Sequence, residues 1–194
     1  MQFSIFKNQL SSWQGRSLIV GLNKDYIDSQ LQTIDFIVDL KQLRKKINNN
    51  NFKGEIGNSI SLEILGNDLD SLTIIGLGEK NKMNSELFRN SLSECIRKVV
   101  DKEDKIGILM PWDALENDAI LDIAETLRLS TYKDNRFNKR RDEKTNLKEI
   151  EFLNFRNNEN ITFKEVEDIC EGVEFARKLV AAPPNDLTPL EMSK

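Results

Sequence analysis

The hydrophobic positions of this chain form two kinds of pattern that alternate along its length. Short apolar or alternating runs are typical of β-strands that lie in a buried sheet. They occupy residues 2–6, 17–22, 59–65, 72–77 and 106–110, and a last one contains Ile150, Phe152 and Phe155. Because the turn-forming segment Gly66-Asn67-Asp68 lies between the third and fourth runs, we expect these two strands to pair as a hairpin.

Between the strands, apolar residues recur every three or four positions, which predicts amphipathic helices. One stripe runs from Ile34 through Ile37, Leu40 and Leu43 to Ile47, and the asparagines of 48–51 should end that helix. A second helix is expected over about 84–100. Two further helices should begin at an N-cap with Glu three residues later, and these pairs are Asp113 with Glu116 and Thr162 with Glu165.

Alternating strands and helices in the second half, with a hairpin in the first, predict an α/β fold. We expect three layers, in which helices flank a mixed sheet. The pattern divides the chain into an N-terminal α/β domain over 1–160 and a connecting helix over 161–182. Residues 183–194 form a Pro-Pro junction followed by the start of another unit.

The junction has a clear local structure. The connecting helix carries a stripe of Val166, Ile169, Cys170, Val173, Ala176 and Val180. Pro183 and Pro184 should end it, because proline lacks the N–H donor and clashes with the preceding turn. Thr188, Pro189 and Glu191 then provide an N-cap, a proline at the first helical position and a glutamate at the third. Because this next helix has begun and the sequence ends three residues after Glu191, we expect that the catalytic part lies in a following domain.

The same residues carry a family resemblance. The segment Gly172-Val173-x-x-Ala176-Arg177-x-Leu179-Val180-x-Ala182-Pro183-Pro184-Asn185-x-Leu187-Thr188-Pro189 resembles the signature that joins the two domains of the leucyl (cytosol) aminopeptidase family. Upstream, the segment 72–80 followed by Leu87-x-Arg89 is similar to the strand, loop and helix of the family's N-terminal domain. Ala124-x-x-x-Arg128-x-x-x-Tyr132-Lys133 is similar to the helix that follows.

The resemblance implies a macro-domain-like N-terminal domain of a peptidase that releases N-terminal residues from peptides. It also implies a C-terminal catalytic domain with two divalent metals, zinc or manganese, a homo-hexameric parent and a cytoplasmic location. The family's metal ligands and catalytic residues lie in motifs of that second domain, so we expect no catalytic, cofactor-binding or metal-binding residue here. The fragment would contribute architecture or oligomer geometry and would be inactive alone.

The amino-acid composition excludes several kinds of catalytic and binding site. The chain of 194 residues contains no histidine, which excludes a Ser-His-Asp or Cys-His unit and any histidine-based zinc site within it. Its net charge of -4 argues against a concentrated nucleic-acid-binding face. No apolar run approaches the roughly 20 residues that span a bilayer. Cys95 and Cys170 each lie on an apolar helix face and should be small buried residues rather than a disulfide or metal pair.

Two features keep other functions open. Gly76-Leu77-Gly78 follows a strand and precedes a helix, where backbone amides could bind a phosphate, so a stand-alone macro-like module for a nucleotide or ADP-ribose is one alternative. The competing interpretation is a tight strand-to-helix turn, since two glycines do not make a complete fingerprint. The cations Arg136, Lys139, Arg140, Arg141 and Lys144 could serve a DNA-binding accessory domain, but interspersed acids favour a solvated loop.

Two junction residues have structural interpretations. Arg177 is a candidate for an ion pair between domains, with an ordinary exposed helix position as the alternative. Asn185 is expected to form a hydrogen bond with the backbone of its own turn.

Overall fold

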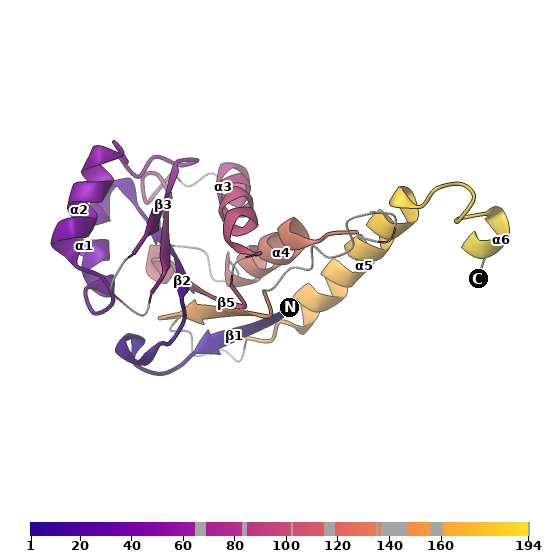
Figure 1. Cartoon of the computed structure of the whole chain (residues 1–194), viewed down its shortest axis with the longest axis horizontal. Helices are drawn as coiled ribbons and strands as arrows, with labels where there is room; N and C mark the ends of the chain where they lie inside the picture. Colours follow the sequence, from indigo (N-terminus) through magenta and orange to yellow (C-terminus); the bar gives the residue numbers. More distant parts are fainter. Residues whose placement is uncertain are drawn as a thin grey trace.

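A six-stranded mixed sheet forms the centre of the computed structural model, with the strand order β1-β6-β5-β2-β4-β3 (Figure 1). The structure describes residues 1–64, 69–82, 85–101, 103–114, 119–134, 136, 147–155 and 161–193. The strands are β1 (Gln2–Phe6), β2 (Ser17–Leu22), β3 (Ser59–Glu63), β4 (Ser71–Gly76), β5 (Lys105–Leu109) and β6 (Glu149–Leu153). All neighbouring strands are parallel except β3 and β4, which are antiparallel. The mixed sheet and the pairing of the two hairpin strands are confirmed, while the turn at residues 66–68 lies outside the described residues.

Helices cover both faces of the sheet, which confirms the three-layer α/β fold (Figure 1). On one face, α1 (Ile27–Leu31) and α2 (Leu40–Asn49) pack on the even-numbered apolar positions of β2, such as Leu18 and Val20. On the other face, α3 (Ser85–Val99), α4 (Ala119–Thr131) and α5 (Lys164–Ala181) enclose a second cluster that contains Ile19, Ile106 and Phe152. Successive strand residues therefore point into different cores, as the period of a strand requires.

The helix predicted from Ile34 to Ile47 is wrong in its first part. The chain forms short turns of helix at Lys24–Tyr26 and Gln32–Ile34 around α1, and α2 begins only at Leu40. The reason is Asp39, whose side chain accepts hydrogen bonds from the amides of Lys41 and Gln42 and so caps α2. The predicted end within the asparagine run is confirmed, since α2 ends at Asn49.

The two predicted helix starts also need correction. Asp113 lies inside a single turn of 3-10 helix, Trp112–Ala114, instead of capping a long helix, and Glu116 lies outside the described residues. At α5 the N-cap is Phe163, one residue after the predicted Thr162, whose hydroxyl accepts from the amide of Lys164 at 3.3 Å. The ring of Phe163 packs on Phe3 and Phe152 with centroid distances of 5.5 Å, which places the start of α5 against the sheet.

The apolar stripe of α5 is only partly buried. Val166 and Cys170 are buried, but Ile169 is 45% and Val180 is 88% exposed, so the domain covers only part of the predicted stripe. Figure 1 shows why: α5 extends away from the sheet, with α6 (Pro189–Met192) beyond its far end. The local structure predicted around Pro183 and Pro184 is confirmed, because α5 ends at Ala181 and the hydroxyl of Thr188 accepts from the amide of Glu191 at 3.3 Å.

Candidate functional site

The amides of Gly76-Leu77-Gly78 are occupied by the protein's own backbone. They donate to main-chain carbonyl oxygens at 2.8, 2.9 and 2.9 Å, those of Asn58, Leu22 and Gly54 respectively. A phosphate-binding loop must instead point several backbone N–H groups at its ligand. Because these three donors are used, the segment lacks the feature on which the nucleotide or ADP-ribose hypothesis depends.

The two glycines have steric roles in this turn. A Cβ at Gly76 would lie 2.2 Å from the carbonyl oxygen of Glu55, which no side chain tolerates. Gly78 has a φ of +72°, in the left-handed region that favours glycine. The segment therefore behaves as the tight strand-to-helix turn that was the competing interpretation.

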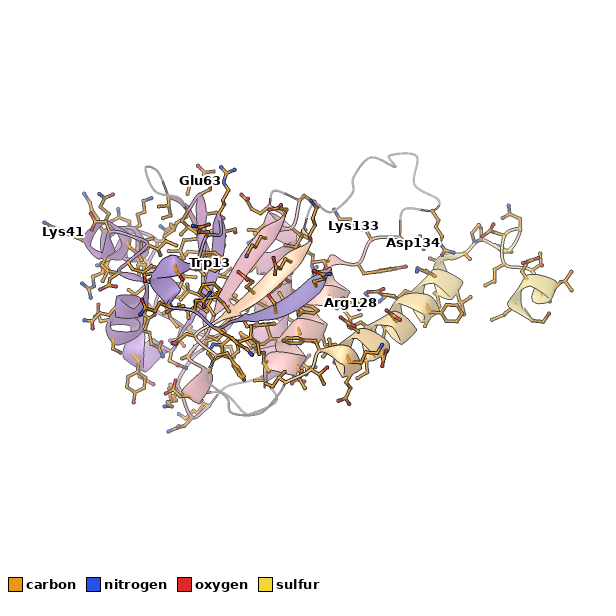
Figure 2. All side chains as sticks on the ribbon, turned by 90° about the horizontal axis from the view of Figure 1, so that it is seen from below. Trp13, Lys41, Glu63, Arg128, Lys133 and Asp134 are labelled. Atoms are coloured by element: carbon orange, nitrogen blue, oxygen red, sulfur yellow. The ribbon has the colours of Figure 1, made fainter. Side chains whose placement is uncertain are left out.

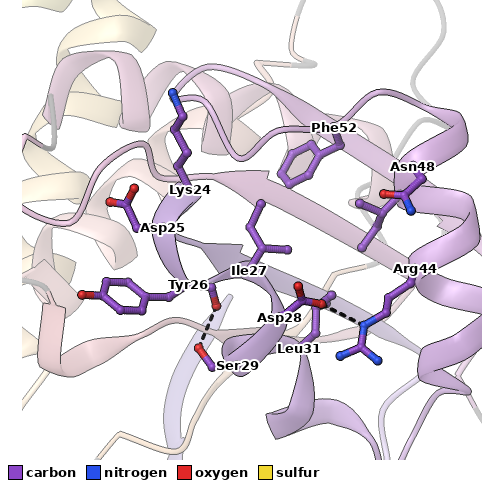
Figure 3. A pocket seen from close by; sticks show the side chains of 11 residues that line it. Lys24, Asp25, Tyr26, Ile27, Asp28, Ser29, Leu31, Arg44, Asn48 and Phe52 are labelled. Atoms are coloured by element: carbon purple, nitrogen blue, oxygen red, sulfur yellow. Dashed lines mark hydrogen bonds and ion pairs between the residues drawn. The ribbon is translucent and has the colours of Figure 1, made fainter.

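A pocket of about 650 Å³ lies between α1 and α2, a feature that no sequence motif indicated. Figure 3 shows Arg44 directed toward Asp28, and the Nε–Oδ1 distance between them is 2.9 Å. Lys24 points away from that pair and reaches Glu55 at 2.6 Å. The cations that line the pocket, Lys24 and Arg44, therefore already have carboxylate partners within the domain. Core residues such as Leu31 and Phe52 form the apolar part of the lining.

Several long-range polar contacts join the end of α4 to α5. Arg128 forms two hydrogen bonds with the Glu174 carboxylate, at 2.9 and 3.3 Å, and both side chains are mostly buried. This geometry, in which two guanidinium nitrogens face two carboxylate oxygens, is the strongest form of such a pair. Figure 2 shows Arg128, Lys133 and Asp134 on the side of the domain that faces α5.

Arg177 takes a role that neither sequence interpretation predicted. Its Nη1 donates to the carbonyl oxygen of Leu129 at 2.8 Å, and its guanidinium lies 5.8 Å from the centroid of the Tyr132 ring. It therefore links α5 to α4 within the domain. Its use in an ion pair between domains stays a prediction.

Of the proposed cationic patch, only Arg136 is described. Its Nη2 donates to the carbonyl oxygen of Lys178 at 2.5 Å and to Asp134 at 2.7 Å. The hydrogen bond from Arg136 lowers the pKa of Asp134 to about 2. Arg136 thus contributes to the contact with α5, and the remaining patch residues, Lys139, Arg140, Arg141 and Lys144, lie outside the described residues.

The two cysteines are buried and unpaired, as predicted. Cys95 is a residue of α3 that points into the core, and Cys170 of α5 lies in the same cluster as residues of α4. Burial raises the pKa of both thiols, that of Cys170 to about 11, so neither is a reactive thiolate at neutral pH.

The other residues singled out from the sequence have local roles. Arg89 forms an ion pair with Asp122 at 2.7 Å, which joins α3 to α4, and Lys133 binds Asp101 at 2.9 Å. The turn after Pro183 is closed by amides of the two residues that follow Asn185, and the side-chain bond of Asn185 stays a prediction.

No group of three or more Cys, Asp and Glu side chains is arranged to hold a metal ion in the part of the chain that the structure describes. Within the same residues, no helix combines the length and apolar character that crossing a bilayer requires.

Comparison with known proteins identifies the fold's family. The sequence model described as the cytosol aminopeptidase family, N-terminal domain, matches residues 19–141, which is well over half of the chain. The chain belongs to this family. The matched region includes the Gly76–Gly78 turn and the α4 residues that contact α5, so the resemblance stated from the sequence is confirmed.

Relatives of the cytosol aminopeptidase family match the whole chain. A probable cytosol aminopeptidase of Prochlorococcus marinus strain MIT 9312 is 56% identical over 194 residues, which is 100% of this chain and 40% of the relative. One from Synechococcus sp. strain CC9311 is 30% identical and is covered to 39%. The chain therefore spans about two fifths of the length of these relatives, and the junction at residues 172–189 lies inside the matched region.

Solved structures share the fold. A mutant of tomato leucine aminopeptidase superimposes with a TM-score of 0.76 at 20% identity, over 99% of this chain and 40% of that one. A bottromycin maturation enzyme, BotP, in complex with manganese gives 0.65 at 15% identity, over 92% and 34%. At these identities the likeness establishes the architecture of the cytosol aminopeptidase N-terminal domain and nothing of the chemistry.

Proposed function

We propose that this chain is the non-catalytic N-terminal domain of a metal-dependent leucyl aminopeptidase that releases N-terminal residues from peptides. The observation that carries the proposal is the family match over residues 19–141, together with relatives named probable cytosol aminopeptidases that are covered to only about 40%. In this proposal the chemistry belongs to a C-terminal catalytic domain of the parent, which lies in the cytoplasm.

The proposed catalytic domain would bind two divalent ions, zinc or manganese. Such ions polarise the scissile carbonyl and lower the pKa of a bound water, which supplies the nucleophile. The residues of this chain would not touch the reacting atoms. They would instead fix the position of the domain in the parent, for which we propose a homo-hexamer.

Exposed apolar side chains on α5 and α6 support the proposal that another domain packs against this end of the molecule. Phe175, Val180, Leu190 and Met192 are 61%, 88%, 70% and 66% exposed. Large apolar side chains that gather on one exposed segment are typical of surfaces that another protein part covers. The proposed occupant is the parent's own catalytic domain, because these residues lie within the interdomain signature or directly after it.

A direct test is an assay of the 194-residue chain with a chromogenic leucine substrate in the presence of Mn²⁺ or Zn²⁺. The complete Prochlorococcus marinus MIT 9312 relative, measured under the same conditions, provides the reference. We expect turnover by the relative and none by the chain alone. Turnover that co-purifies with the chain and is abolished by a chelator would overturn the proposed division of labour.

A further inference from the structure

The C-terminal half of α5 contains no fully buried apolar side chain, and only Val173 and Leu179 are half-buried there. The helix runs over Lys164–Ala181, and the residues it buries are Val166 and Cys170, both in its first half. Beyond Cys170, Phe175 is 61% and Val180 is 88% exposed. Helices in proteins draw most of their stability from a buried apolar face. Another interaction must therefore fix the direction of residues 171–181.

The first such interaction is the pair between Arg128 of α4 and Glu174 of α5. The side chains are only 16% and 18% exposed, and both guanidinium–carboxylate bonds are formed. Arg128 also lies 3.8 Å from Glu171, one turn earlier in α5. A partly buried pair of this kind is screened by salt much less than an exposed one. It anchors the middle of α5 immediately after the last buried residue.

The second interaction is a reciprocal capping of the two helix ends. The last carbonyl groups of a helix lack intrahelical partners and carry the negative end of its dipole. Arg177 of α5 donates to the carbonyl of Leu129 in the last turn of α4. In return, Arg136, which follows α4, donates to the carbonyl of Lys178 in the last turn of α5. The amide of Ala182 donates to Leu179, one residue later than regular helix geometry would give, which leaves the Lys178 carbonyl for Arg136.

We propose that Arg128, Arg136 and Arg177 form a polar clamp that sets the direction of α5, and with it the position of the Pro183-Pro184 junction. The three arginines are positioning residues. When the clamp is broken, residues 171–182 should detach together while the sheet and α3 stay folded. The inference concerns the 194-residue chain itself and does not depend on an aminopeptidase activity.

Hydrogen exchange and thiol labelling of the chain can test the clamp. We would compare wild type with the R128M/R136M/R177M variant and with the more conservative E174Q variant. Lys164→Met is the matched control, because it removes an exposed ion pair with Asp168 from the same helix outside the clamp. Cys170 reports on α5 and Cys95 on the α3 core, since both thiols are buried and free.

In the triple variant we expect amide exchange in residues 171–182 to accelerate by at least about tenfold, the effect of losing one charged hydrogen bond. Cys170 should be alkylated faster by a similar factor, with Cys95 and the β5 amides unchanged. E174Q should give a smaller change in the same direction, and Lys164→Met none.

Unchanged exchange in residues 171–182 of the triple variant would overturn the proposal. So would equal acceleration at Cys170, Cys95 and β5, because α5 would then open only with the whole domain. If the triple variant does not fold, the R136M/R177M variant decides, because it removes the reciprocal capping of the two helix ends and keeps the Arg128–Glu174 pair. Faster exchange confined to 171–182 supports the clamp, and unchanged exchange contradicts it.

Discussion

At the residue scale, Gly76 is a position where a neighbouring backbone segment leaves no room for a side chain. Replacement by alanine would place a methyl group against the carbonyl of Glu55, a backbone atom that cannot move aside as a side chain would. We expect Gly76→Ala to lower the free energy of unfolding by about 2–3 kcal/mol, as overpacking of a core does. Denaturation in urea measures this change.

Gly172 provides the matched control for that substitution. It lies inside α5, and a Cβ there would meet no atom within 4 Å. Gly172→Ala should therefore stabilise the chain by about 0.5–1 kcal/mol, because glycine is a poor helix former. Equal and small effects of the two substitutions would contradict the steric role assigned to the Gly76 turn.

Asp134 gives the clamp a defined dependence on pH. Its pKa in the folded chain is about 2, lowered first of all by the hydrogen bond from Arg136. Because that value lies below the usual pKa of about 3.9, the ionised carboxylate stabilises the fold above about pH 4. The contribution is lost as the pH falls from about 4 to 2, when protonation removes the charge that holds Arg136.

An NMR titration of the Asp134 carboxyl carbon tests this assignment. We expect a midpoint near 2 in wild type and a midpoint close to the ordinary aspartate value of about 3.9 in the R136M variant. The same ordinary midpoint in both proteins would show that Arg136 does not hold this carboxylate.

At the element scale, the start of α2 depends on one side chain. The carboxylate of Asp39 accepts from the amides of Lys41 and Gln42 at 2.9 and 3.3 Å. We expect Asp39→Ala to cost about 1 kcal/mol of stability, the usual value for a lost N-cap. Asp35→Ala is the control, since Asp35 is an exposed residue just before this cap. Similar thermal unfolding of the two variants would contradict the capping role.

The sequence predicts correctly those elements whose structure is decided by a single residue pattern. The strands and the hairpin pairing follow from short apolar runs, and the Pro-Pro junction follows from the chemistry of proline and the Thr188 cap. It failed where two signals compete. The stripe from Ile34 to Ile47 has helical spacing, but Asp39 interrupts it, and the core receives Ile34 from a separate turn of helix.

The candidate site was harder to predict, because its contacts join distant positions. Arg128 and Glu174 lie 46 residues apart, and Arg177 and Leu129 lie 48 apart. No spacing rule connects such residues before the fold is known. Apolar periodicity in α5 was also misleading, since it continues past Cys170 into residues that the domain leaves exposed. An apolar stripe that this domain buries only in part is expected for a helix that packs against two neighbouring parts of a protein.

At the scale of the whole molecule, the sheet, the clamp and the exposed α5–α6 surface form one argument. The α/β domain has two cores of its own, the proposed clamp directs α5 away from it, and the apolar residues Phe175 and Val180 beyond Cys170 are exposed. Within the proposed function, the catalytic domain of the parent covers these residues. The domain would then act through geometry, by presenting the junction in one orientation.

A chimera tests the central claim most directly. In the Prochlorococcus marinus MIT 9312 relative, the region that matches this chain would be replaced by residues 1–194. The measurement is the metal-dependent release of an N-terminal leucine. The account predicts turnover close to that of the intact relative for the chimera, and none for the 194-residue chain alone. A folded chimera without activity, or metal-dependent turnover by the chain itself, would contradict it.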